Sequence, residues 1–200
     1  SLAEEISEVD VKIQQGTYFK TLEKLSEYNT RKKVIIVLGS NIGNLSHEEA
    51  VNFLENIANA MSDDDMLFMG FDQKKDPQTI LNAYNDPAGI TSEFNKNLLV
   101  RINSELEGEF DTDSFLHWET YDPETGTAKS FLVSKKSQNI PIKKLGLEVN
   151  FDAWESINTE ISQKYDDSIV NWLADQAGLN LEQSFNDEKN WYKNYIFRKK

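Results

Sequence analysis

Between residues 34 and 61 the chain changes from an apolar run to a polar loop and then to a periodic apolar pattern. Val34 to Leu38 is unbroken and mostly β-branched, which is typical of a central parallel strand covered on both faces. Over 46–61 the apolar residues recur at helical spacing behind Ser46, a good N-cap, which predicts a helix. The loop between them holds Gly39, Gly43, Ser40, Asn41 and Asn44. Ligands bind at the carboxyl ends of strands in open α/β sheets, so this loop is a candidate site, although an ordinary strand-to-helix turn explains the local pattern equally well.

A second apolar run, Met66 to Phe71, predicts a buried strand that completes a strand, helix, strand unit. Two helices are predicted next, over 77–84 and 91–106. The second has Thr91 or Ser92 as its cap. Its predicted apolar face consists of Phe94, Leu98, Leu99, Ile102 and Leu106.

From residue 115 to about residue 149 the pattern changes to that of antiparallel strands. The predicted elements of this half are strands over 115–121 and 128–134, shorter strands near Ile140 and Leu147, a helix over 168–177 closed by Gly178, and a strand over 192–198. A meander of this kind is foreign to a doubly wound sheet, so we expect a second small domain. At the other end, Val9 to Gln14 alternates and predicts a strand with no helix before it, as in a fragment that enters a sheet partway through.

The charge and composition exclude several classes of function. Of the 200 residues, 34 are acidic and 21 basic, and the net charge of -13 argues against nucleic acid and anionic membrane surfaces as partners. The absence of cysteine removes disulfides, thiolate zinc sites and cysteine nucleophiles. No apolar run approaches the roughly 20 residues that span a bilayer, and the acidic N-terminus resembles no signal peptide. We therefore expect a soluble cytoplasmic protein.

No metal site is predicted from the residues that most often bind metals. His47 lies in the first turn of a predicted helix and His117 stands alone in a predicted strand, so neither has the partners for a metal site or a catalytic triad. The acidic run Asp63-Asp64-Asp65 lacks the spacing of a calcium loop and is expected to be a solvated turn.

Five separate stretches together resemble one family. They are LGSNIGN (38–44), GFDQKKD (70–76), NAYNDPAGITSEFNKN (82–97), INSELEGEFD (102–111) and TEISQKY (159–165). In order and spacing they are similar to the histidine-specific S-adenosylmethionine-dependent methyltransferases, typified by the L-histidine Nα-methyltransferase of ergothioneine biosynthesis. The resemblance implies an α/β fold, the C-terminal part of a Rossmann-like class I methyltransferase domain, with a second α+β substrate-binding domain inserted. Its implied boundaries are 1–73 with 165–200 for the first domain and 74–164 for the second.

The resemblance also implies an amino-acid substrate and assigns residues to it. Asn44 would hydrogen-bond the substrate carboxylate, and Gly39 would approach the substrate through its backbone. Tyr84 would be a second hydrogen-bonding partner. Glu160 and Ser162 would bind the imidazole, and residues two apart in an extended segment share one face, so both could reach one ring. Three of these residues also have a purely structural interpretation. Asn44 would be a turn residue, Tyr84 a packed core aromatic and Glu160 a solvated surface carboxylate.

The cofactor implied by the resemblance is S-adenosylmethionine, with Thr17 and Tyr18 near its adenine. The family has Gly-Asp-Phe or Gly-Asp-Tyr where this chain has Gly16-Thr17-Tyr18, so a hydroxyl replaces a carboxylate. Ser130 lies where the histidine enzyme has a larger apolar residue beside the acceptor ring, and a change in pocket volume can select another amino acid. No general base is evident among these residues.

Three alternatives stay open at this point. One is a degenerate, non-catalytic binding module of the same fold, and another is a methyltransferase for a different amine acceptor. An NAD-dependent dehydrogenase is the weakest, because no GxGxxG motif is present. On the methyltransferase interpretation these 200 residues alone are expected to be inactive, because the upstream half of the cofactor site would be missing.

Overall fold

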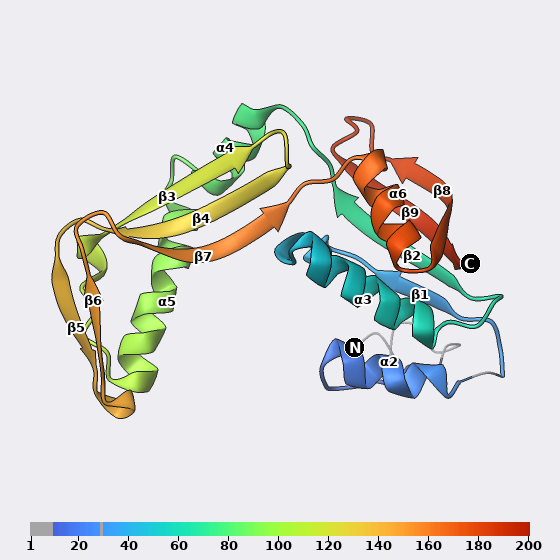
Figure 1. The fold of residues 1–200 in the computed structure, drawn as a ribbon, viewed down its shortest axis with the longest axis horizontal. Coiled ribbons are helices and arrows are strands. Elements are labelled where there is room, and N and C mark those ends of the chain that lie inside the picture. Colours follow the sequence, from blue (N-terminus) through green and yellow to red (C-terminus); the bar gives the residue numbers. More distant parts are fainter. Residues whose placement is uncertain (1–9, 29) are drawn as a thin grey trace.

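The computed structural model describes residues 10–28 and 30–200, which form two lobes joined by a narrow connection (Figure 1). The first lobe is built on a sheet of four strands, in the order β1-β2-β9-β8 in the described part of the chain. Its elements are α2 (Tyr18–Ser26), β1 (Val34–Val37), the 3-10 turn η1 (Asn41–Asn44), α3 (His47–Ala60), β2 (Met66–Asp72), α6 (Asp167–Gln176), β8 (Leu179–Asn186) and β9 (Tyr192–Lys199).

The predicted strand, helix, strand unit is confirmed. β1 and β2 are parallel, with Val34 opposite Met66, and α3 connects them. The helix begins as expected, because the Ser46 side chain accepts from the backbone N–H of Glu49 while the Glu49 carboxylate accepts from the N–H of Ser46. β9 runs antiparallel to both β2 and β8, so the sheet is mixed and the α/β class is confirmed.

The central position predicted for β1 is wrong within the described sheet. β1 pairs with β2 alone there and forms the sheet edge. Val34 and Ile36 are 59% and 60% exposed, whereas Ile35 and Val37 pack on the core. A continuous apolar run indicates that both faces of a strand can be buried, but it does not identify the element that packs on the second face.

Two elements of the first lobe were not predicted, and one prediction fails. α2 starts after Thr17, whose side chain accepts from the backbone N–H of Lys20, and β8 follows directly after the left-handed turn at Gly178. The mostly polar β8 is held by its hairpin with β9 rather than by burial. The strand predicted over 9–14 is absent from residues 10–14, while Val9 lies outside the described residues.

The second lobe packs two helices on a small antiparallel sheet, ordered β3-β4-β7, with a hairpin of β5 and β6 beside it. Its elements are α4 (Pro77–Tyr84), α5 (Ile90–Leu106), η2 (Thr112–Ser114), β3 (Phe115–Asp122), β4 (Thr127–Ser134), β5 (Gln138–Ile142), η3 (Lys143–Leu145), β6 (Leu147–Phe151) and β7 (Ser156–Gln163). This lobe has a hydrophobic core of its own, which includes Leu99, Phe110, Phe115, Leu132 and Phe151.

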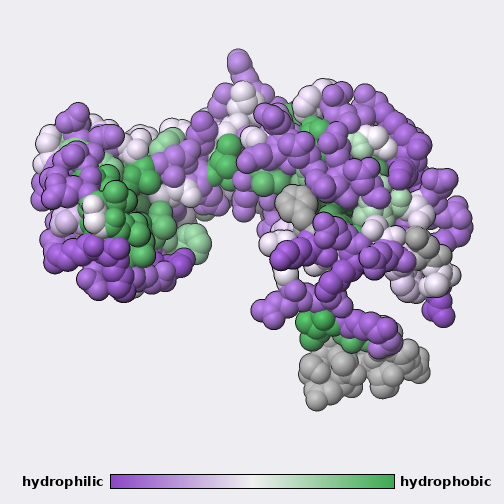
Figure 2. Space-filling view, turned by 60° about the horizontal axis from the view of Figure 1, so that its bottom comes forward, coloured by the Kyte–Doolittle hydropathy of each residue, from purple (hydrophilic) through white to green (hydrophobic). Residues whose placement is uncertain are grey.

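The predicted apolar face of α5 is only partly buried. Leu99 is fully buried, and Ile102 and Leu106 pack on the core of the second lobe. Phe94 is 73% exposed and Leu98 also faces outward, because the sheet covers one side of the helix. Figure 2 shows hydrophobic side chains on the surface of this lobe, within a mostly hydrophilic molecule.

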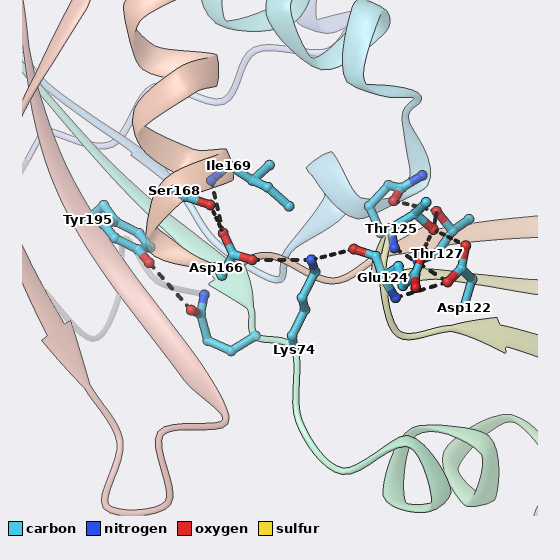
Figure 3. Close-up of polar contacts among 11 residues, drawn as sticks. Lys74, Asp122, Glu124, Thr125, Thr127, Asp166, Ser168, Ile169 and Tyr195 are labelled. Atoms are coloured by element: carbon cyan, nitrogen blue, oxygen red, sulfur yellow. Dashed lines mark hydrogen bonds and ion pairs between the residues drawn. The ribbon is translucent and has the colours of Figure 1, made fainter.

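The lobes meet where two chain segments cross side by side. Gln73, just after β2, forms a parallel bridge with Tyr165, just after β7. Figure 3 shows how the β3–β4 turn is fastened to this crossing: the ammonium of Lys74 lies 3.2 Å from the carboxylate of Asp166 and donates to the backbone carbonyl of Glu124 at 2.9 Å. The crossing therefore holds the ends of β2, β4 and β7 together.

Candidate functional site

The loop after β1 adopts a strained path that places η1 at the crossing. Gly39 and Ser40 both have positive φ, +84° and +53°, in the left-handed region. The Ser40 hydroxyl accepts from the backbone N–H of Asp72 at 3.0 Å, and the buried hydroxyl of Tyr165 donates to the carbonyl of Ile42 at 3.0 Å. The loop is therefore held at both ends by the segments that join the lobes.

This arrangement brings η1 directly against β7. A Cβ added at Gly43 would lie 3.1 Å from the carbonyl oxygen of Gln163 and 3.7 Å from the hydroxyl of Ser162. Gly43 is buried, and its lack of a side chain permits this close approach. The 3-10 turn that ends in Asn44 thus lies beside Ser162, although the two residues are far apart in the sequence.

Lys164 connects two of the predicted acceptor-binding residues of the second lobe, Tyr84 and Ser162. Its ammonium donates to the hydroxyl of Tyr84 at 2.9 Å and to the hydroxyl of Ser162 at 2.9 Å. It also lies 2.8 Å from the carboxylate of Asp72, whose other oxygen is 2.6 Å from the ammonium of Lys75. Tyr84 and Ser162 are therefore brought together through one buried cation.

A cavity of about 370 Å³ adjoins this cluster. Its lining comes from β2, the segment between β2 and α4, α4, the segment after β7 and the segment before β9: Asp72, Lys75, Thr79, Ile80, Ala83, Tyr84, Lys164 and Trp191. The ammonium of Lys75 lies 5.3 Å from the centre of the Trp191 ring, a cation–π contact that forms part of one wall.

Glu160 lies in a row of three side chains that crosses the sheet of the second lobe. Ser130 is the register partner of both Glu119 on β3 and Glu160 on β7, and paired residues of neighbouring antiparallel strands point to the same face. Ser130 is 1% exposed, and its hydroxyl has no hydrogen-bond partner among the described residues. Ser162 stands one row further along β7, opposite Ala128, so Glu160 and Ser162 share the face as predicted.

Thr17 and Tyr18 lie elsewhere, at the start of α2. Tyr18 lines a cavity of about 390 Å³ together with Val37, Asn41 and Phe53, and its ring meets that of Phe53 edge-on at 5.7 Å. The side-chain amide of Asn41 donates to the Tyr18 hydroxyl at 3.4 Å. Asn41 belongs to η1, so the same 3-10 turn lines this cavity and, through Gly43, approaches Ser162 on β7.

Comparison with known proteins shows the family of this chain. The sequence profile described as "Histidine-specific methyltransferase, SAM-dependent" matches residues 1–199. This chain belongs to that family.

Three curated relatives are 28–36% identical to the chain over the residues that align. A histidine N-alpha-methyltransferase of Mycobacterium tuberculosis is 33% identical over 188 residues, which cover 94% of this chain and 58% of the relative. A protein of the same name from Mycolicibacterium smegmatis is 36% identical over 149 residues, 74% of this chain and 46% of the relative. An L-tryptophan methyltransferase of Psilocybe serbica is 28% identical over 160 residues, 79% of this chain and 44% of the relative. The chain therefore spans about half the length of these relatives.

The cavity beside Tyr18 fits part of the cofactor that the histidine-specific methyltransferases use. An adenosyl group has an aromatic face and several hydrogen-bonding edges, and the cavity offers the Tyr18 and Phe53 rings beside the amides of Asn41 and Asn52. Thr17 uses its hydroxyl oxygen to accept from the N–H of Lys20, and a hydroxyl group also carries one donor. Among the residues that the structure describes, no group of three or more His, Cys, Asp or Glu side chains could hold a metal ion.

Three polar residues of the site were missed in the sequence. Lys164 and Asp72 form the buried ion pair, and the phenol of Tyr192 lies near the backbone N–H groups of Gly39 and Ser40. Burial raises the pKa of the Tyr192 phenol, and these two N–H groups partly oppose the change. The alternation of side chains along β7 could have found Lys164, since it follows Ser162 by two residues. Nothing in the sequence near Tyr192 pointed to the loop after β1.

No helix among residues 10–28 and 30–200 is both long and apolar enough to cross a membrane.

Proposed function

We propose that the protein to which this chain belongs transfers a methyl group from S-adenosylmethionine to the α-amino group of histidine or a related amino acid. The observation that carries the proposal is the Lys164 cluster, which joins Tyr84 and Ser162 beside the turn that ends in Asn44. Tyr84 and Ser162 come from separate stretches of the chain and meet at one buried cation. Most of the curated relatives bear names that refer to histidine methylation or ergothioneine biosynthesis, which agrees with this acceptor.

Each predicted acceptor-binding residue then has a chemical role. The amide of Asn44 donates to the substrate carboxylate without adding charge. Gly39 offers close backbone approach, because among the described residues no atom beyond its chain neighbours lies within 4 Å of its missing Cβ. Tyr84 supplies a second hydrogen bond. Glu160 accepts from an imidazole N–H, and Ser162 binds the same ring from the next row of the sheet.

The cofactor supplies an electrophilic methyl group when it is bound, with Tyr18 and Thr17 against its adenine. The work left to this chain is to bind the acceptor, to hold its amine in line for transfer and to exclude water. In that view η1 contributes to both sides, with Asn41 toward the cofactor and Asn44 toward the acceptor. The group that removes the amine proton is not assigned.

We also propose that the chain is divided into two domains. We assign residues 1–73 and 165–200 to a Rossmann-like class I methyltransferase domain and residues 74–164 to an inserted substrate-binding domain. The separate hydrophobic cores of the two lobes support this division. We expect the 200 residues by themselves to be inactive, with a full-length protein required for turnover.

The test is a mass-spectrometric methyl-transfer assay on the full-length protein with S-adenosylmethionine and each amino acid in turn. Methylated histidine is expected from the wild-type protein and is expected to fall at least tenfold in Glu160→Ala. Glu55→Ala, an exposed carboxylate on α3, is the matched control and should retain activity. Absence of any methylated product together with absence of cofactor binding would leave the non-catalytic binding module as the better description.

A different acceptor is the second candidate, and Ser130 is the observation that favours it. The buried Ser130 hydroxyl has no partner among the described residues and lies in register with Glu160, where an acceptor side chain would be bound. A buried hydroxyl without a partner is costly, so an acceptor with one more hydrogen-bonding group than histidine would gain from it. The Psilocybe serbica relative bears the name of a tryptophan methyltransferase, which agrees with variation of the acceptor within the family. A product from another amino acid, with none from histidine, would select this candidate.

A further inference from the structure

Lys164 is a buried cation whose hydrogen-bonding capacity is fully used. The residue is 4% exposed, and its ammonium reaches the carboxylate of Asp72 and the hydroxyls of Tyr84 and Ser162 at 2.8, 2.9 and 2.9 Å. An ammonium has three N–H donors and no acceptor. With three partners at hydrogen-bond distance, each of the three oxygens receives one of these donors.

The two hydroxyl groups are thereby given a fixed direction. The oxygens of Tyr84 and Ser162 each accept from Lys164, so their own protons must point away from it. A serine hydroxyl without such a neighbour can rotate and either donate or accept. Beside Lys164 each hydroxyl acts as a donor toward whatever ligand occupies the site.

The charge of Lys164 is maintained by its surroundings. Burial alone would lower the pKa of the ammonium, but the bonds to Asp72 and Tyr84 outweigh it and the pKa is raised. The other charged or titratable groups around the cluster are Lys75 beyond Asp72, Tyr121 and Asp122 on β3, Tyr192 on β9, and the two carboxylates in register with Ser130, Glu119 on β3 and Glu160 on β7. Burial raises the pKa of the Tyr121 phenol, so this group stays neutral at physiological pH.

We propose that Lys164 is a positioning residue that makes Tyr84 and Ser162 obligatory donors and so selects the neutral form of the acceptor side chain. This inference rests on the proposed function. A neutral imidazole has one ring nitrogen that accepts, matched by the Ser162 hydroxyl, and one N–H that donates, matched by Glu160. An imidazolium has two N–H groups and would place one of them against the Ser162 proton. The Tyr84 hydroxyl, in turn, donates its proton in a hydrogen bond to the carboxylate of the amino-acid substrate.

The decisive readout is the pH dependence of histidine binding, because imidazole changes charge between pH 5 and 8. In the full-length wild-type protein we expect the calorimetric Kd for histidine to rise about tenfold per pH unit below the imidazole pKa of about 6.5. In Lys164→Met the Ser162 hydroxyl can turn and accept, so the Kd at pH 8 should be weaker while its rise at low pH should largely disappear. Lys164→Arg keeps a cation that only donates, and it should retain the pH dependence.

Two further variants separate this role from a merely structural one. Ser162→Ala removes the hydroxyl through which Lys164 acts, so adding Lys164→Met to it should not change the pH dependence again. Asp72→Asn combined with Lys164→Met removes both charges of the buried pair and supplies a folded alternative if Lys164→Met alone unfolds. A Lys164→Met protein with a uniformly weaker Kd and the wild-type pH dependence would overturn the proposal.

The identity of the acceptor and the role of Lys164 are tested by separate measurements. If the wild-type protein binds and methylates an amino acid other than histidine, the histidine assignment fails by itself. The Kd of that acceptor is then measured, in place of the Kd of histidine, in a double-mutant cycle of Lys164→Met, Ser162→Ala and the double variant. Additive effects of the two substitutions in that cycle would show that Lys164 does not act through Ser162.

Discussion

The carboxylate of Asp65 lies 2.8 Å from the ammonium of Lys33, and both side chains are buried. Asp65 also accepts from the backbone N–H groups of Lys33 and Ser62, each at 2.7 Å. Burial alone would raise the pKa of this carboxyl, but the hydrogen bonds and the charge of Lys33 outweigh it and lower the pKa. The expectation of a solvated acidic turn is therefore wrong for Asp65, which ties the start of β2 to the start of β1.

We predict that Asp65→Asn destabilises the protein strongly. Removing one member of a buried pair leaves an uncompensated charge, which costs about 3–5 kcal/mol. The neighbouring pair of Asp64 and Lys32, at 3.1 Å, is the matched control because both side chains are more than 70% exposed. Asp64→Asn should cost about 0–1 kcal/mol. Chemical denaturation measures both, and equal midpoints for the two variants would contradict the prediction.

Gly126 in the β3–β4 turn is predicted to be essential for stability. Its φ is +75°, and an added Cβ would overlap the carbonyl oxygen of Lys164. Gly126→Ala should therefore cost about 2–4 kcal/mol, from backbone strain together with overpacking. Gly146→Ala is the control, since Gly146 has a φ of +61° but, in the part of the chain that the structure describes, no atom beyond its neighbours within 4 Å of its missing Cβ. It should cost about 1 kcal/mol in the same unfolding experiment.

We predict that the protein loses stability in acid because of Asp166, which lies at the crossing of the two lobes. Burial alone would raise its pKa, but bonds from Ser168, the N–H of Ile169 and Lys74 lower the pKa to about 2. Because the folded pKa lies below the ordinary value of 3.8, this stabilisation is complete above about pH 4 and is lost as the pH falls toward 2. The carboxylate is 41% exposed, so solvent screening limits the effect to about 1 kcal/mol.

Unfolding free energies between pH 2 and pH 6 measure this contribution. Asp166→Asn should be less stable than the wild-type protein at pH 6 and should approach it near pH 2. A stability difference that stays constant over this range would show that the charge of Asp166 is not responsible.

Tyr84→Phe is predicted to weaken binding of the amino-acid acceptor. The variant loses the hydroxyl proton that Lys164 directs away from itself, and a hydrogen bond to a charged carboxylate is worth about 1.5–3 kcal/mol. The Kd of the acceptor should therefore rise roughly 10- to 100-fold. The Kd of S-adenosylmethionine should stay unchanged, because Tyr84 does not line the cavity beside Tyr18.

The control for this change is Tyr28→Phe, whose side chain is 47% exposed at the surface. It should leave both dissociation constants at their wild-type values. An equal loss of acceptor and cofactor affinity in Tyr84→Phe would instead indicate a general effect on the fold.

Local patterns predicted those parts of the fold whose stabilising contacts are themselves local. Ser46 and Glu49 cap α3 within four residues of chain, and Asp76 caps α4 by accepting from the N–H of Thr79. The alternation along β7 put Glu160 and Ser162 on one face. The position of β1 and the exposure of Phe94 were predicted wrongly, because both depend on what packs against an element and not on the element itself.

The sequence by itself determined the family, the α/β class and the residue types available to bind an amino acid. Only the tertiary structure decided that Asp72, Tyr84 and Ser162 meet at Lys164, since these residues belong to β2, α4 and β7 and are separated by up to about 90 positions. A buried ammonium needs polar partners for its N–H donors, and the three oxygens around Lys164 come together only through the crossing of two distant segments. No periodicity or motif along one segment contains that information.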